Sequence, residues 1–173
     1  MTRRTFLVTA AAAVAAKTEG VAWTQWGGPH RNFITEATGL KSSWPATGPK
    51  VMWKRPLGEG FSSPSVEAGF LYTMYGRSGQ EIVTALDAAT GKTLWEHSTP
   101  TTFRSDFQEM GNGPYATPLV VGDRLFSAGV DGRLQCLDKK TGKLQWTQML
   151  WGDHGGTRLM YGYASSPIAF RGA

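Results

Sequence analysis

Two stretches of this sequence concentrate side chains that could bind a ligand. The first contains Arg104, Asp106, Glu109 and Tyr115, and the second contains Asp153, His154, Arg158, Tyr161 and Tyr163. Guanidinium groups donate hydrogen bonds, carboxylates accept them, and histidine can do either. Neither stretch has the spacing of a nucleophile with its base or of a set of metal ligands, so we expect ligand contacts there and assign no catalytic residue and no metal ligand. Two solvated loops that bind nothing are the alternative.

Motifs for phosphate or dinucleotide binding are incomplete. The run Thr90–Thr93 resembles the end of a phosphate-binding loop, but Leu86 stands where that loop requires glycine. The run Gly111–Ala116 fits the loose dinucleotide fingerprint, yet Pro114 favours a turn over the helix that would hold the phosphates. Cys136 is the only cysteine, which excludes an internal disulfide and favours a small buried strand residue. The sequence therefore identifies no cofactor.

An eleven-residue repeat indicates which elements hold the two stretches in place. It runs from Ala85 to Trp95 and again from Cys136 to Trp146, at an offset of 51 residues. A repeat of this period is typical of propellers and solenoids. In each copy the aspartate can accept hydrogen bonds from the turn, the glycine supplies a positive φ, and the tryptophan can pack against a neighbouring unit. The residues given these structural roles are Asp87, Gly91, Trp95, Asp138, Gly142 and Trp146, with Trp53 in a weaker third copy.

A proline element precedes each unit. Pro64, Pro118 and Pro167 each follow a serine or threonine and open an apolar run, and proline suits the first residue of a strand. With the repeat, this gives four strands per unit. We therefore predict an all-β fold, a β-propeller built from four-stranded antiparallel blades, incomplete here at about three blades. The two ligand-binding stretches join consecutive blades, and we expect them on one face of the propeller.

The repeat, of the form A-x-D-x-x-T-G-K-x-x-W, resembles that of the quinoprotein family, the PQQ-like β-propellers. The resemblance extends from about Trp23 to the end of the chain, and the runs Trp23–Pro29 and Pro56–Pro64 are similar to the opening of exported members. The family includes PQQ-dependent alcohol dehydrogenases and the propeller lipoprotein of outer-membrane protein assembly. The resemblance therefore implies the fold and leaves the activity open.

The first sixteen residues have the pattern of a Tat-type signal peptide. Arg3 and Arg4 precede an apolar run that ends at Ala16, and cleavage could extend to residue 22. Tat export implies contact with the Tat translocase and a periplasmic or secreted protein. No cysteine near the cleavage sites forms a lipobox, and no later apolar run is long enough for a transmembrane anchor. The expected divisions are the signal peptide at 1–16, a lead-in segment at 17–50 and propeller repeats at 51–173, truncated at the C-terminus.

These observations favour an exported scaffold that binds a protein or a small-molecule ligand, without identifiable catalytic residues in this chain. The alternative is a PQQ-dependent alcohol or sugar dehydrogenase whose active-site residues, together with PQQ and calcium, belong mostly to missing blades. Whether the protein is an enzyme stays open between the two. The formal net charge of +5 falls to +3 without Arg3 and Arg4, a surplus too small and scattered to predict nucleic acid as a partner.

Overall fold

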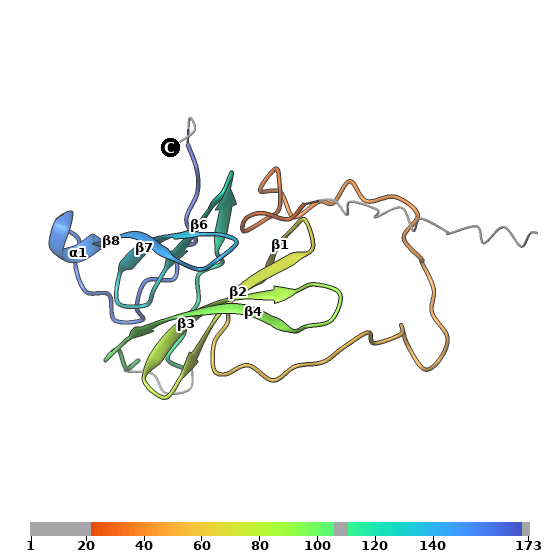
Figure 1. Cartoon of the computed structure of the whole chain (residues 1–173), viewed down its shortest axis with the longest axis horizontal. Helices are drawn as coiled ribbons and strands as arrows, with labels where there is room; N and C mark the ends of the chain where they lie inside the picture. Colours follow the sequence, from red (N-terminus) through yellow and green to blue (C-terminus); the bar gives the residue numbers. More distant parts are fainter. Residues whose placement is uncertain (1–21, 106–110, 171–173) are drawn as a thin grey trace, which may run out of the picture.

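The computed structural model describes residues 22–105 and 111–170, and their regular structure is almost entirely β (Figure 1). One antiparallel sheet contains, in order, β1 (Ser65–Glu67), β2 (Phe70–Arg77), β3 (Gln80–Asp87) and β4 (Thr93–Pro100). A second contains β5 (Leu119–Val121), β6 (Arg124–Ala128), β7 (Arg133–Asp138) and β8 (Leu144–Met149), followed by a one-turn helix, α1 (Leu150–Asp153). The prediction of four-stranded antiparallel propeller blades is confirmed.

The last two strands of the two blades pair in the same register, at the 51-residue offset of the repeat. Ala85 pairs with Trp95 in the first blade, and Cys136 pairs with Trp146 in the second. Both blades also have an irregularity directly after this pair, between residues 85 and 86 and between residues 136 and 137. The run after Pro167, where a further blade was expected to begin, forms no strand within the described residues.

The aspartate of each repeat organises the turn that follows β3 or β7. Asp87 Oδ1 accepts hydrogen bonds from the N–H groups of Ala89 and Thr90, at 3.1 and 2.8 Å, and from the Thr90 hydroxyl at 2.7 Å. Asp138 accepts the same three hydrogen bonds one repeat later. Because the bonds from the Thr141 hydroxyl and N–H favour the carboxylate form, they lower the pKa of Asp138.

Two tryptophans dock on the turn of the blade that follows their own unit. The indole N–H of Trp95 donates to the carbonyl of Lys139 at 3.1 Å, and that of Trp53 donates to the carbonyl of Ala88 at 3.0 Å. Trp95 also lies so close to Gly142 that a Cβ there would be 2.5 Å from its Cε3 atom, and Gly142 has a φ of +71°. Glycine is therefore required at this turn both by the backbone conformation and by the indole.

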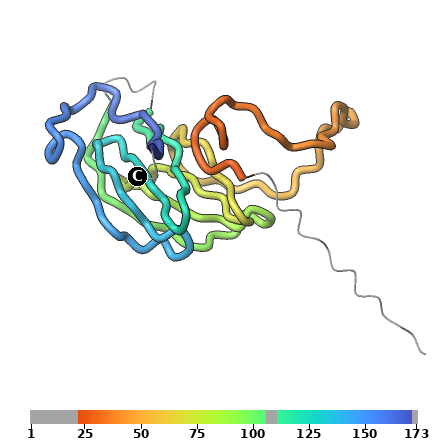
Figure 2. Tube along the Cα trace, turned by 90° about the horizontal axis from the view of Figure 1, so that it is seen from above, coloured from red at the N-terminus to blue at the C-terminus, as the bar shows by residue number. Residues whose placement is uncertain are grey.

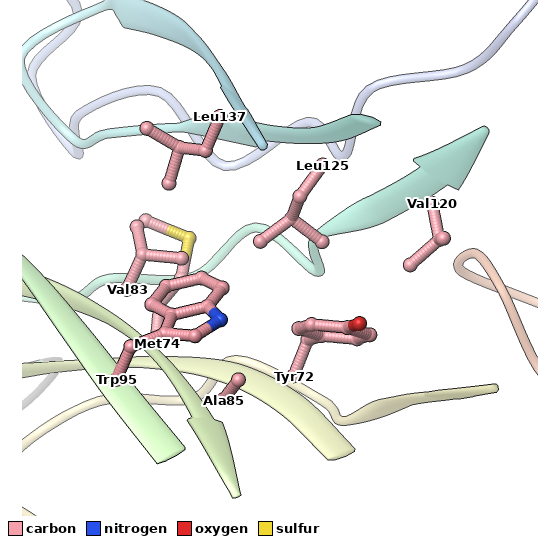
Figure 3. Close-up of a cluster of buried hydrophobic side chains, with 8 residues drawn as sticks. All are labelled: Tyr72, Met74, Val83, Ala85, Trp95, Val120, Leu125 and Leu137. Carbon is pink, nitrogen blue, oxygen red and sulfur yellow. The ribbon is translucent and has the colours of Figure 1, made fainter. Parts of the chain in front are cut away.

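The core lies between the two sheets, as Figure 3 shows. Side chains of the first blade point toward side chains of the second, and the cluster comprises Tyr72, Met74, Val83, Ala85, Trp95, Val120, Leu125 and Leu137. Burial of a large apolar side chain stabilises a fold by roughly 1.5–3 kcal/mol. The contact becomes polar farther along the strands, where Gln135 Nε2 lies 3.1 Å from His97 Nε2 and 3.2 Å from Thr99 Oγ1.

The opposite face of the second sheet has no such cover within the described residues. Trp146, the counterpart of Trp95, is 37% exposed, whereas Trp95 is 9% exposed. Trp146 contacts Phe126, with 5.9 Å between ring centroids, and lines a mostly apolar hollow of about 650 Å³ together with Leu134 and Ile168. The inter-blade packing expected of Trp146 is thus not made in this part of the chain.

The lead-in segment joins the inner edges of both blades before it turns outward. Trp23 exchanges two backbone hydrogen bonds of 2.8 Å with Val66 in β1, and the carbonyl of Thr24 accepts the N–H of Val120 in β5 at 2.8 Å. The chain then forms a long loop beside the sheets and returns to Trp53 (Figures 1 and 2). Across the described ranges, no helix has the length and apolar character needed to cross a membrane.

Candidate functional site

Two adjacent pockets lie where the turns of the blades meet the connections between them. We call this surface the loop face; it comprises residues 76–81, 101–104, 112–113, 130–131, 151, 158 and 163, together with Glu59. The first pocket has a volume of about 210 Å³ and is formed by the β2–β3 turn and the connection from β4 to β5. The second has a volume of about 200 Å³ and is formed by the β6–β7 turn and the connection after β8. Phe103 lines both pockets, so they are neighbours.

Glu81 is the most distinctive group of the first pocket. It is only 7% exposed, and one carboxylate oxygen accepts the N–H of Val130 at 3.1 Å. The other oxygen lies against Gly129, where a Cβ would be 2.4 Å from it. Burial raises the pKa of Glu81 to about 7, because desolvation outweighs the hydrogen bond from Val130. A buried acid with a shifted pKa in a pocket is a common feature of functional sites.

Charged groups of both signs line the same pocket as Glu81. Glu59 lines the same pocket and is held there by backbone hydrogen bonds to Gly76, of 3.0 and 2.6 Å. Arg104 also lines the pocket and donates from Nη1 to the carbonyl of Phe103 at 2.6 Å. Arg77, at the rim, lies 3.4 Å from the Glu96 carboxylate. The pocket therefore presents both hydrogen-bond acceptors and donors to a ligand.

Asn112 supports the wall of the first pocket. Its side-chain carbonyl accepts the N–H of Ser105 at 3.1 Å, which fixes one part of the β4–β5 connection against another. Its amide nitrogen is then oriented by this contact. On the other wall, the N–H of Thr101 donates to the carbonyl of Gly79 at 3.0 Å, so the connection is also tied to the β2–β3 turn.

Aromatic side chains dominate the second pocket. Trp151 donates its indole N–H to the carbonyl of Asp131 at 2.8 Å, and the Tyr163 hydroxyl donates to the carbonyl of Thr157 at 2.8 Å. Both rings lie against Gly132, where a Cβ would be 2.7 Å from Tyr163 and 3.0 Å from Trp151. The two rings are thus fixed at their polar atoms while Trp151 remains 47% exposed.

The structure places three of the sequence-predicted ligand residues in these pockets. Arg104 lines the first pocket, and Arg158 and Tyr163 line the second. Tyr115 lies elsewhere, since its hydroxyl donates to the carbonyl of Gly111 at 2.9 Å and its ring stacks on Phe61. Asp106 and Glu109 lie outside the described residues.

The remaining candidates make local contacts near the end of β8. Asp153 accepts the N–H of Met149 at 2.6 Å, and His154 Nε2 lies 2.7 Å from the side-chain oxygen of Gln148. Tyr161 is 47% exposed and does not line either loop-face pocket. Of the five residues predicted in the second stretch, Arg158 and Tyr163 therefore line a pocket of the loop face, and the other three do not.

Sequence reasoning did not select Glu81, Phe103 or Trp151. A signal for Glu81 was present, because the position 51 residues later is Gly132 and the repeat thus does not account for a glutamate. Phe103 and Trp151 lie in the dissimilar connections between blades, but an isolated aromatic residue there has no motif that distinguishes it from a packing residue.

The described residues do not build a site for PQQ and calcium. Residues 22–105 and 111–170 contain no cluster of three or more His, Cys, Asp or Glu side chains that could hold a metal ion. PQQ is a tricarboxylate, and the first pocket presents Glu81 and Glu59 beside Arg104 and Arg77, so it has no surplus of positive charge to bind that group. A quinone site would need groups beyond those that the loop face presents here.

Comparison with known proteins gives matches to one group. Residues 9–169 match the family described as outer membrane protein assembly factor BamB. A 1-butanol dehydrogenase (quinone) of Thauera butanivorans is 28% identical over 100 residues, which cover 57% of this chain and 15% of that protein. A quinoprotein ethanol dehydrogenase of Pseudomonas putida is 34% identical over 82 residues, which cover 46% of this chain and 12% of that protein. The chain thus spans between 12% and 15% of the length of these relatives.

Solved structures of similar proteins were also found. BamB from Moraxella catarrhalis has 23% sequence identity and a TM-score of 0.42, over 56% of this chain and 26% of that chain. The quinohemoprotein alcohol dehydrogenase ADHIIG from Pseudomonas putida HK5 has 25% identity and a TM-score of 0.47, over 66% of this chain and 16% of that chain.

Proposed function

The chain belongs to the PQQ-like β-propeller family described as outer membrane protein assembly factor BamB, and from that premise we propose that it is an exported binding propeller. Its loop face binds a small polar ligand, and the rest of the repeat serves as the scaffold. The observation that supports this proposal best is the pair of adjacent pockets at the junction of two blades. Their lining departs from the repeat at Glu81, whereas the repeated Asp, Gly and Trp residues are used in turns and packing.

The binding proposal is tested with the full-length mature protein and a library of small polar metabolites. We expect at least one class of compound to raise the unfolding temperature in proportion to its concentration, because a ligand that binds only the native state stabilises it. Glu81→Gln should abolish that rise. Lys143→Ala, an exposed change on the repeat turn after β7, should preserve it. If no compound of the library changes the unfolding temperature, the proposed binding function is wrong.

Export is the second part of the proposal and rests on the N-terminal sequence. Residues 1–16 form the Tat-type signal peptide, with cleavage as far as residue 22, residues 17–50 form the lead-in segment and residues 51–173 the repeats. The mature protein is then periplasmic or secreted. Fusion of residues 1–22 to a reporter that is active only after export should give activity, and replacement of Arg3 and Arg4 by lysine should abolish it. Unchanged activity would exclude the Tat route.

A second function is favoured by the relatives rather than by the pockets. Because the chain matches quinone-dependent alcohol dehydrogenases at 28–35% identity, the whole protein could oxidise an alcohol with PQQ and calcium, the quinone accepting the electrons. The described residues contain no cluster of metal ligands, and the first pocket has no surplus of positive charge for that cofactor. Reconstitution of the full-length protein with PQQ and calcium chloride, followed by dye-linked oxidation of butan-1-ol and ethanol, decides between the two functions. Oxidation of either alcohol would show that the protein is a dehydrogenase and would overturn the proposal of a binding propeller.

A further inference from the structure

We propose that the ligand of the loop face is a neutral saccharide that spans both pockets. This inference rests on the proposed binding function and names the chemical class of the ligand. It is carried by the balance of charge in the first pocket, by the rigid aromatic surface of the second, and by the position of Phe103 between them.

The charges of the first pocket exclude strongly ionic ligands. A cation would be attracted by Glu81 and Glu59 but repelled by Arg104 and Arg77, and an anion would meet the opposite arrangement. A neutral molecule with several hydroxyl groups suits this lining, because each hydroxyl can donate to a carboxylate and accept from a guanidinium or amide. Saccharides carry such hydroxyl groups at high density.

Glu81 retains capacity to accept a ligand hydroxyl. Val130 occupies one of its carboxylate oxygens, and the nearby Arg133 is engaged with Asp131 at 3.2 Å. Glu81 forms no ion pair with another described residue, so no basic side chain of the described ranges competes with a ligand for the carboxylate. Glu81 can accept a hydrogen bond from a hydroxyl group as the carboxylate and can also donate one as the acid. A saccharide hydroxyl placed here would therefore have a partner in either protonation state.

The second pocket offers the apolar contact that a sugar ring also needs. One face of a pyranose ring is lined by C–H groups, which pack on exposed aromatic surface. Trp151 provides such surface, and its indole is fixed by Asp131 and by contact with Gly132. A fixed aromatic ring loses little conformational freedom when a ligand binds. Arg158 lines the same pocket and can donate to the hydroxyl groups at the ring edge.

The size of the two pockets indicates more than one sugar unit. Each pocket alone is smaller than the roughly 300–1,000 Å³ typical of small-molecule sites. The volumes of about 210 and 200 Å³ reach that range together, and the pockets share Phe103 as a wall. A disaccharide or longer glycan would place a hydroxyl-rich ring against Glu81 and the next ring against Trp151.

The test uses isothermal titration calorimetry on the full-length mature protein. The saccharide probes are cellobiose, maltose, lactose and N,N′-diacetylchitobiose, and the charged probes are putrescine and citrate. We expect one of the disaccharides to bind. Trp151→Ala and Glu81→Gln should each weaken that binding at least about tenfold, equivalent to about 1.4 kcal/mol. Trp151→Phe should retain most of the affinity, because it keeps an aromatic surface.

The matched control is Trp146→Ala. This change also removes an exposed tryptophan, but one that lies in β8 and lines neither pocket of the loop face. It should leave disaccharide binding unchanged. Binding that survives both Trp151→Ala and Glu81→Gln would overturn the inference. If putrescine or citrate binds and no disaccharide does, the proposal of a saccharide ligand is wrong, and the proposal that the protein is a binding propeller stands. If no probe in the panel or in the metabolite library binds, both proposals fail.

Discussion

The docking of Trp95 makes a quantitative prediction about stability, with Trp146 as its natural control. Trp95 is 9% exposed, packs on Gly142 and Tyr72, and donates to Lys139 at 3.1 Å. Truncation of a buried aromatic residue to alanine costs about 3–5 kcal/mol, and the lost hydrogen bond adds about 1 kcal/mol. We expect Trp95→Ala to lower the free energy of unfolding by about 4 kcal/mol.

Trp146→Ala should have a much smaller effect. Trp146 is 37% exposed, and its main aromatic contact is Phe126, so we expect a loss of about 1 kcal/mol. Urea unfolding followed by circular dichroism measures the difference. With a slope of about 2 kcal/mol per molar urea, the midpoint should fall by about 2 M for Trp95→Ala and by about 0.5 M for Trp146→Ala. Equal shifts would refute the claim that the indole packs on the next blade only in the first case.

Three further predictions concern single residues. Because the folded-state pKa of Glu81 is raised from 4.5 to about 7, its contribution to stability is full below pH 4.5 and is lost as the pH rises through 7, by about 3 kcal/mol; Glu81→Gln should flatten the pH dependence of the urea midpoint. Gly142→Ala should lower the melting temperature more than Gly122→Ala does, because both glycines have a positive φ but only Gly142 faces an indole. Arg104→Ala and His154→Ala should each change the unfolding free energy by less than about 0.5 kcal/mol, because both side chains are exposed.

Clear results would contradict each of these. A pH profile unchanged by Glu81→Gln would contradict the raised pKa of this buried carboxyl group. Equal melting temperatures for the two glycine variants would contradict the claim that the Trp95 indole leaves no room for a side chain at Gly142. A cooperative loss of structure in Arg104→Ala would mean that its hydrogen bond to Phe103 holds the connection in place.

The fold could be predicted from the sequence because its determinants are local and repeated. The Asp, Gly and Trp of each unit act within one turn or on the next one, so two copies 51 residues apart were enough to define strands and blades. The exposure of Trp146 could not be predicted in the same way, because the repeat gives both tryptophans the same role and does not show which residues cover each indole.

The candidate site was predicted only in part, for a physical reason. The polar residues predicted in the connections between blades include Arg104, Arg158 and Tyr163, which line the two pockets of the loop face. Asp153 and His154 instead form hydrogen bonds with residues four and six positions away, and side-chain chemistry alone does not reveal such local partners. Glu81 was missed because it lies in β3, where the alternation of a blade strand is expected, although its counterpart Gly132 showed that the repeat does not require it.

The contact of a tryptophan with the next blade also limits the symmetry with which such units can assemble. One surface of a blade provides the indole and the other provides the glycine turn, so the contact joins unlike surfaces and has a direction. Contacts of this heterologous kind close into rings when the rotation per unit permits it and otherwise continue as helical filaments. Two copies of this chain related by a twofold axis would bring like surfaces together, and neither indole would then find a glycine.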